Sequence, residues 1–194
     1  MNEKKLYIIA GCNGAGKTTA SFNILPDILG CKEFVNADEI ARGISPFQPD
    51  TVAFEAGRIM LKRINELMNA GVDFALETTL SSLTYRQFIQ EAQSQGYYVT
   101  LLYYWLETPQ LAIERVAKRV ASGGHNIPPD VIKRRYVKGI KNFFNFYTHI
   151  CDYSQLYDNS QKNSILVYRN RKSGNETVFD QERLNSIKKY LNEG

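Results

Sequence analysis

Cysteine and histidine are scarce in this chain of 194 residues, which contains three cysteines and two histidines. Cys12, Cys31 and Cys151 are odd in number and lack the close spacing of metal-ligand pairs, which argues against both a zinc site and a disulfide framework. They are expected to be free thiols in a reducing cytoplasm. Long hydrophobic runs are also missing, and none approaches the roughly 18 residues that a membrane span needs.

The N-terminal apolar run is too brief for a signal peptide and leads directly into a glycine-rich loop. Internal repeats, low-complexity tracts and long flexible linkers are absent, so residues 1–194 are expected to form a single domain. The protein is therefore expected to be cytoplasmic, with no membrane partner.

That loop is the strongest motif in the sequence. Residues 11–18 read GCNGAGKT and match G-x-x-x-x-G-K-[ST], the phosphate-binding loop, and they follow an apolar strand at Leu6–Ala10. Backbone N–H groups of such a loop surround a polyphosphate, and the following helix favours negative charge at its N-terminus. Lys17 is expected to reach the β- and γ-phosphates, and the Thr18 hydroxyl to hold Mg²⁺. The residues expected to bind ATP are Gly11, Asn13, Gly14, Ala15, Gly16, Lys17, Thr18, Thr19 and Arg115.

Strands and helices alternate along the chain, which predicts an α/β fold. Expected strands are Leu6–Ala10, Glu33–Asn36, Phe74–Leu76, Tyr97–Leu106 and Ile165–Arg169, with helices between and after them. We therefore predict a three-layer P-loop NTPase fold of the kinase type, with a mostly parallel central sheet and a helical lid. Ligands of such sheets bind beyond the carboxyl ends of the strands.

Two acidic residues fall at those strand ends. Asp38 can accept or place the proton of an attacking hydroxyl, although it could instead serve as a helix N-cap. Glu77 and Thr79 alternate along an extended strand end and could both contact a polyhydroxylated substrate. Glu77 could equally be an acid beside the metal ion.

Positive charge is concentrated in one segment, residues 109–147, which carries a net charge of +6 against +4 for the whole chain. This segment is expected to form a lid of two helices separated by a loop that contains Gly123 and Gly124. Arginine forks neutralise developing phosphate charge, and the candidates for this catalytic role are Arg119, Arg134 and Arg135. A surface that binds nucleic acid, and a basic helix pair that is merely solvated, are the alternatives.

Taken together, residues 11–19, 35–42, 77–79 and 115–135 resemble the zeta toxin family of phosphate-loop kinases. Characterised members of that family phosphorylate UDP-N-acetylglucosamine on a sugar hydroxyl and are neutralised by a small antitoxin. The resemblance implies that Asp38 is the catalytic aspartate, that Arg42, Glu77 and Thr79 contact substrate, and that Lys17 and Thr18 serve ATP and Mg²⁺. Arg119, with Arg134 or Arg135, would clamp phosphate.

Two positions depart from the family pattern. Ser81 stands where the family has an arginine, and the interval from Asp38 to Arg42 is one residue longer than the common form. Both departures lie on the acceptor side. The residues predict a kinase that uses ATP and Mg²⁺ and acts on a hydroxyl of a small acceptor, and the resemblance implies that this acceptor is a UDP-N-acetyl sugar. No segment resembles a built-in antitoxin, so an antitoxin would be a separate protein. A nucleic-acid-linked enzyme, with less support, and a slow regulatory ATPase are the alternative functions.

Overall fold

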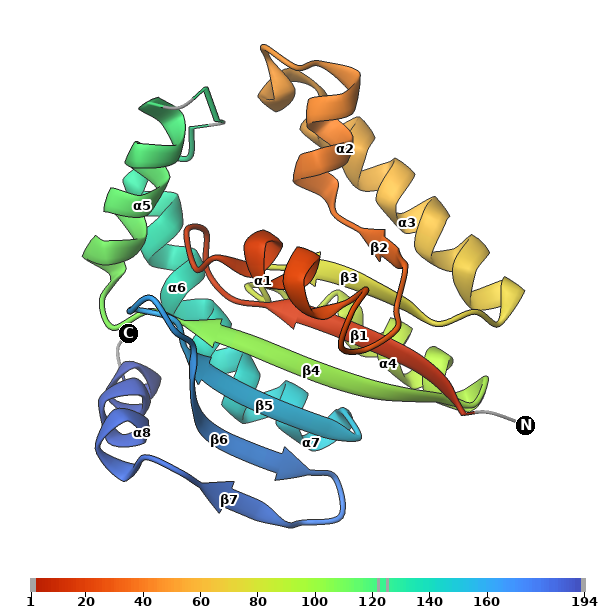
Figure 1. Ribbon diagram of the computed structural model, residues 1–194, viewed down its shortest axis with the longest axis vertical. Coiled ribbons are helices and arrows are strands. Elements are labelled where there is room, and N and C mark those ends of the chain that lie inside the picture. The colour runs from red at the N-terminus through yellow and green to blue at the C-terminus, as the bar shows by residue number, and fades with distance from the viewer. Residues whose placement is uncertain (1–2, 122, 125, 193–194) are drawn as a thin grey trace.

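A twisted sheet of seven strands forms the centre of the protein in a computed structural model, which describes residues 3–121, 123–124 and 126–192 (Figure 1). The strands are β1 (Lys4–Ala10), β2 (Glu33–Val35), β3 (Phe74–Thr78), β4 (Tyr97–Trp105), β5 (Tyr153–Asp158), β6 (Ile165–Arg171) and β7 (Glu176–Val178). Their spatial order is β2-β3-β1-β4-β5-β6-β7. The first five strands in this order pair in parallel, and β6 and β7 extend the sheet antiparallel. The predicted α/β fold with a mostly parallel sheet is confirmed.

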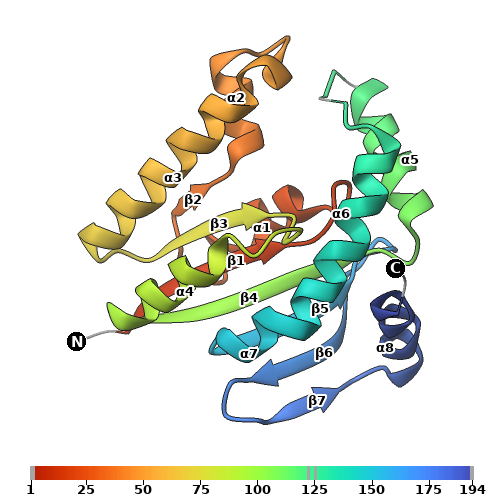
Figure 2. The ribbon, with the colours of Figure 1, turned by 180° about the vertical axis from the view of Figure 1, so that it is seen from behind.

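The helices are α1 (Lys17–Ile24), α2 (Ala37–Ile44), α3 (Ala53–Ala70), α4 (Tyr85–Ser94), α5 (Pro109–Ala121), α6 (Pro129–Asn142), α7 (Thr148–Ile150) and α8 (Gln181–Lys188). Short turns η1 (Pro49–Val52) and η3 (Lys189–Leu191) are 3₁₀, and η2 (Phe143–Tyr147) is a π-helical turn that joins α6 to α7. Seen from behind, α4, α6 and α7 cover one face of the sheet, and α1 lies on the other (Figure 2). None of the helices in the described part of the chain combines the length and apolar character that crossing a bilayer demands.

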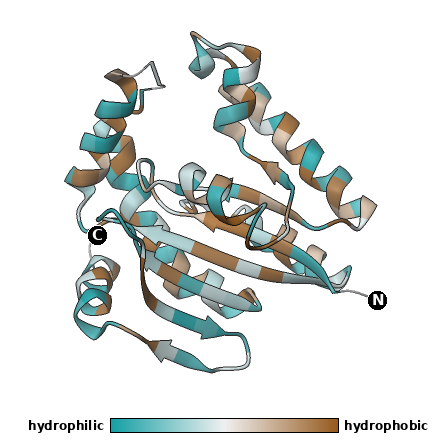
Figure 3. Cartoon of the chain, viewed as in Figure 1, coloured by the Kyte–Doolittle hydropathy of each residue, from teal (hydrophilic) through white to brown (hydrophobic). Residues whose placement is uncertain are grey.

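The core follows from the composition of the central strands. In β1 the five residues Leu6–Ala10 are all buried, and β4 is buried at seven of its nine positions. Continuous burial is what a parallel strand between two helical layers requires. In Figure 3 hydrophobic segments lie along β1 and alternate with pale segments along β4, which is rich in tyrosine, whereas α8 is mostly hydrophilic. The buried sheet therefore gives rigid support to the loops at its carboxyl edge.

Two helical arms rise beyond that edge. One consists of α2, η1 and α3, the other of α5 and α6, and the loop between β1 and α1 lies at their base (Figure 1). Strand boundaries differ slightly from expectation: β1 begins at Lys4, β3 continues to Thr78, and β2 ends at Val35 because Asn36 becomes the N-cap of α2. The antiparallel strand β7 was not predicted, because its three residues are all exposed and give no hydrophobic pattern.

Candidate active site

The phosphate loop lies between β1 and α1, as the motif predicts. Gly11, Gly14 and Gly16 all have positive φ angles, which lets the backbone curl around a small cavity of about 190 Å³. Lys17 is 6% exposed, and its Nζ donates to the carbonyl of Cys12 at 3.0 Å. The residues that line this phosphate cavity are Asn13, Gly14, Gly16, Lys17, Thr18, Thr19, Asp38, Glu77, Arg115 and Arg119.

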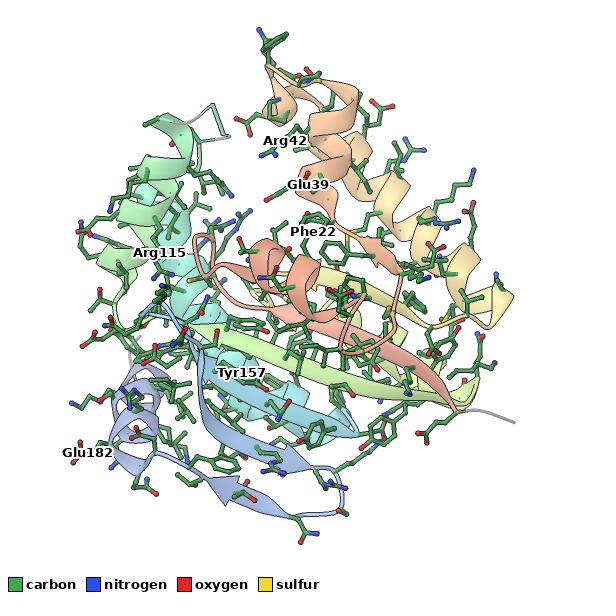
Figure 4. The ribbon with its side chains drawn as sticks, in the orientation of Figure 1. Phe22, Glu39, Arg42, Arg115, Tyr157 and Glu182 are labelled. Atoms are coloured by element: carbon green, nitrogen blue, oxygen red, sulfur yellow. The ribbon has the colours of Figure 1, made fainter. Side chains whose placement is uncertain are left out.

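Contacts from distant parts of the chain hold this loop in place. Asn159 Nδ2 donates to the carbonyl of Ala15 at 2.7 Å. Arg115 donates to the carbonyls of Asn159 and Ser160 at 2.9 and 2.7 Å, so its guanidinium ties α5 to the β5–β6 loop. Arg115, labelled in Figure 4, also lines the phosphate cavity. Its position fits the predicted contact with ATP, but two of its N–H donors already have protein acceptors.

Glu77 lies beside Thr18 in the phosphate cavity. Its Oε2 accepts from Thr18 Oγ1 at 2.8 Å and from Asn36 Nδ2 at 2.9 Å, and its Oε1 is 3.5 Å from Lys17 Nζ. This geometry favours the alternative in which Glu77 is an acid beside the metal. A carboxylate and a hydroxyl fit Mg²⁺, which usually takes one or two protein oxygens and completes its shell with phosphates and waters. Among the described residues, no group of three or more His, Cys, Asp or Glu side chains is placed to hold a metal by itself.

Asp38 lies in the first turn of α2, beyond the end of β2. The N-cap of that helix is Asn36, whose Oδ1 accepts from the Asp38 backbone N–H at 2.8 Å. The alternative in which Asp38 caps the helix is therefore wrong, because the cap position is two residues earlier. The Asp38 side chain is exposed and lines both the phosphate cavity and its neighbour. Its carboxylate has no ion pair in the part of the chain that the structure describes, so it is available to a ligand.

The neighbouring cavity, of about 390 Å³, lies between the two helical arms, and we call it the acceptor cavity. Its charged lining comprises Arg42, Arg119, Arg134, Arg135, Asp38, Glu39 and Asp50. Figure 4 shows Arg42 and Glu39 on the side of α2 that faces α5, and these two side chains form an exposed ion pair of 3.5 Å. Thr18, Asp38 and Arg119 line both cavities, so the two spaces meet at these residues.

The lid contacts the phosphate loop directly. Arg135 Nη1, from α6, donates to Asn13 Oδ1 at 3.1 Å across 122 positions of sequence. Arg134 is exposed and Arg119 is half-buried, and both line the acceptor cavity. The structure therefore brings all three predicted catalytic arginines to the space beside Asp38.

Thr79 was predicted to contact substrate together with Arg42 and Glu77, but the structure does not place it at either cavity. The strand ends at Thr78, and Thr79 Oγ1 pairs with Ser81 Oγ at 2.9 Å. Thr79 lines neither cavity, so the expectation that Glu77 and Thr79 face one ligand is not met by this geometry. In the lid loop, Ser122 and His125 lie outside the described residues.

The sequence did not predict the contacts of two residues that hold the site together. Asn36 contacts both Asp38 and Glu77, and Asn159 supports the phosphate loop. An Asn two residues before an acidic helix start is a cap pattern and could have identified the first of these roles. The Asn159 contact spans 144 positions and leaves no local signal.

Comparisons with known proteins agree with this architecture. The family model described as Zeta toxin matches residues 32–173. An uncharacterized protein of Haemophilus influenzae is 33% identical over 144 residues, which cover 70% of this chain and 100% of that relative.

Among solved structures, one chain of the AvrRxo1-ORF1:AvrRxo1-ORF2 complex with sulphate ions superposes with a TM-score of 0.77 and 16% identity. The match covers 95% of this chain but only 63% of that chain. A chain from the PezAT toxin-antitoxin system of Streptococcus pneumoniae superposes with a TM-score of 0.66 and 18% identity, covering 100% of this chain and 88% of that one. At these identities the structural matches establish a shared fold.

The family match spans most of the chain and includes β2, Asp38, Glu77 and both lid helices. The phosphate loop precedes the matched region, and its own motif and geometry identify it independently. The chain thus belongs to the Zeta toxin family, and it is a kinase-type phosphotransferase with a P-loop fold.

Proposed function

We propose that this kinase transfers the γ-phosphate of ATP, with Mg²⁺, to a hydroxyl of a small anionic acceptor, for which a UDP-N-acetyl sugar is the leading candidate. The observation that carries the proposal is the junction of the two cavities, where Thr18, Asp38 and Arg119 line both. A donor phosphate in one cavity and a hydroxyl in the other would approach each other at Asp38. Such positioning is the main contribution of a protein to phosphoryl transfer.

Each residue has a definite role in this proposal. Lys17 and the loop N–H groups bind the β- and γ-phosphates, and Asp38 orients the acceptor hydroxyl and takes its proton. Arg119 and Arg135 offset the charge that develops on the transferred group, while Arg134 and Arg42 bind the anionic part of the acceptor. Mg²⁺, when bound beside Thr18 and Glu77, would neutralise phosphate charge.

The wild-type protein, incubated with Mg-ATP and a panel of UDP-sugars, should give a product heavier by one phosphoryl group in mass spectrometry. Asp38→Asn should lower kcat at least about 100-fold, the scale of general-base catalysis, and leave ATP binding nearly unchanged. Asp27→Asn is the matched control, because Asp27 is an exposed carboxylate that lines neither cavity. If ATP is hydrolysed at a rate that no acceptor changes, the phosphotransfer proposal is wrong and the protein is a slow ATPase.

We also propose that a separate antitoxin protein neutralises this kinase in the cytoplasm. The support is family membership together with the structural neighbour PezAT, which is a toxin-antitoxin system. Free thiols at all three cysteines fit a reducing compartment. Induced expression should arrest growth with the wild-type protein and not with Asp38→Asn. Equal growth with both proteins would refute toxicity through this site.

A further inference from the structure

Asn36 joins the two halves of the candidate site through one side chain. It is the residue between β2 and α2, it is 6% exposed, and both ends of its amide are engaged. Its Oδ1 accepts from the backbone N–H of Asp38 at 2.8 Å, and its Nδ2 donates to Glu77 Oε2 at 2.9 Å. The backbone of Asp38 and the carboxylate of Glu77 are thus both hydrogen-bonded to the Asn36 amide.

We infer that Asn36 is a positioning residue that fixes the Glu77 carboxylate, and through it the Thr18 hydroxyl, in the geometry that binds Mg-ATP beside Asp38. The inference rests on the proposed use of Mg-ATP. It gives Asn36 a role that the family match does not assign.

The hydrogen-bond inventory explains why the Asn36 amide matters. Thr18 donates its only hydroxyl proton to Glu77 Oε2, and its Oγ1 also accepts a longer contact of 3.5 Å from Asn36 Nδ2, which leaves one lone pair for a cation in the phosphate cavity. The same Oε2 receives the Asn36 amide, while Oε1 lies 3.5 Å from Lys17 Nζ. Without the amide donor, the Thr18 hydroxyl and Lys17 would be the remaining partners of this carboxylate, and rotation toward Lys17 would release the Thr18 proton. Groups behind a metal ligand commonly change metal affinity 10- to 100-fold in this way.

A helix cap alone does not account for these contacts. Capping of α2 uses only Oδ1, and serine or aspartate would provide an equivalent acceptor. The donor to Glu77 is an additional feature: of the three side chains only asparagine carries an acceptor and a donor on separate terminal atoms, whereas aspartate would face Glu77 with a second carboxylate and serine has one shorter hydroxyl for both contacts. A role limited to capping therefore predicts that Asn, Ser and Asp are interchangeable, whereas a positioning role predicts that they are not.

The surroundings of Asn36 make the contact sensitive to substitution. On its other side Asn36 lines a cavity of about 750 Å³ between α1, β2, α2 and α3. Phe22 from α1 and Glu39 from α2, both labelled in Figure 4, line the same cavity. A shorter side chain at position 36 would open a path for water from this cavity to the Glu77 carboxylate, which is 9% exposed. Water would compete for the oxygen that now accepts from Thr18.

The test compares Asn36→Ser and Asn36→Asp with the wild-type full-length protein. Binding of a fluorescent ATP analogue is measured while Mg²⁺ is titrated, and Tm is measured in parallel. For Asn36→Ser we expect a Tm within about 3 °C of wild type, because the cap is retained. The Mg²⁺ concentration for half-maximal nucleotide binding should rise about 10-fold, and further for Asn36→Asp. In the kinase assay kcat should fall more than the KM of the acceptor changes.

Two further variants separate positioning from folding. Asp180→Asn retains the N-cap of α8, far along the chain, and should leave the Mg²⁺ response unchanged. In a Glu77→Gln background, Asn36→Ser should add little, because the carboxylate through which Asn36 acts is already gone. This comparison remains informative if a single variant loses stability.

Wild-type Mg²⁺ dependence in both Asn36→Ser and Asn36→Asp would overturn the inference and leave the proposed kinase function standing. Nucleotide binding by the wild-type protein that does not respond to Mg²⁺ would overturn the donor half of the proposed function, and the inference with it.

Discussion

Gly11 opens the phosphate loop, and replacing it with alanine should destabilise the protein strongly. Its φ angle is +139°, and a Cβ at this position would lie 2.2 Å from the carbonyl oxygen of Tyr104. That oxygen belongs to β4, which is hydrogen-bonded to β1 on one side and β5 on the other, so it cannot move aside cheaply. Backbone strain and overpacking each cost about 1–3 kcal/mol, which together give about 2–6 kcal/mol. For a chain of this length the corresponding loss in Tm is about 5–20 °C.

The matched control is Gly57→Ala in α3. An added Cβ there has no heavy atom within 4 Å, and the helical backbone suits alanine. This variant should gain up to about 1 kcal/mol, because glycine is a poor helix former. Thermal melts followed by circular dichroism, with and without Mg-ATP, compare the two variants. A Gly11→Ala protein that melts within 2 °C of wild type would refute the steric argument.

Three other predictions concern the thiols and the lid. Burial raises the pKa of the Cys12 and Cys31 thiols to about 11 and raises that of Cys151 as well, so all three stay protonated at pH 8. A thiol-specific disulfide reagent should therefore label none of the three cysteines in the native protein and all three in guanidinium. Rapid labelling of the native protein would contradict the burial of these thiols. Arg135→Ala should lower kcat about 100-fold with little change in Tm. Lys133→Ala, on the exposed side of the same helix, should leave kcat unchanged. If the Arg135→Ala and Lys133→Ala proteins have equal kcat values, Arg135 has no part in catalysis. Arg115→Ala should lower the free energy of unfolding in urea by about 2–4 kcal/mol, because two charge-assisted hydrogen bonds to the β5–β6 loop disappear. A loss under about 0.5 kcal/mol would show that these two hydrogen bonds do not stabilise the fold.

The donor half of the site could be predicted from sequence because its geometry is local. A strand, a glycine-rich turn and a helix that begins at Lys17 are adjacent in the chain, and the motif encodes the loop directly. Asp38 and Glu77 were also predictable, since the carboxyl ends of neighbouring parallel strands meet at one edge of the sheet.

The acceptor half was only partly predictable because tertiary packing decides which side chains reach it. Alternation along an extended strand predicts that Thr79 faces the same way as Glu77, but the strand ends at Thr78 and the chain turns, with Leu80 at a φ of +57°. Thr79 then pairs with Ser81, the position where the family has an arginine. The departure noted in the sequence thus coincides with a local turn that removes Thr79 from the cavities.

Contacts between segments that are distant in sequence place the lid helices beside the phosphate loop. The positive charge of residues 109–147 is compatible with nucleic-acid binding when it is considered as a sequence pattern. In the folded protein, Arg135 bonds Asn13 of the phosphate loop, and Arg119 and Arg134 line the space beside Asp38. These three arginines line a cavity of about 390 Å³, a size that is typical of small-molecule sites. The placement of the lid, more than its charge, is therefore what favours phosphoryl transfer to a small acceptor.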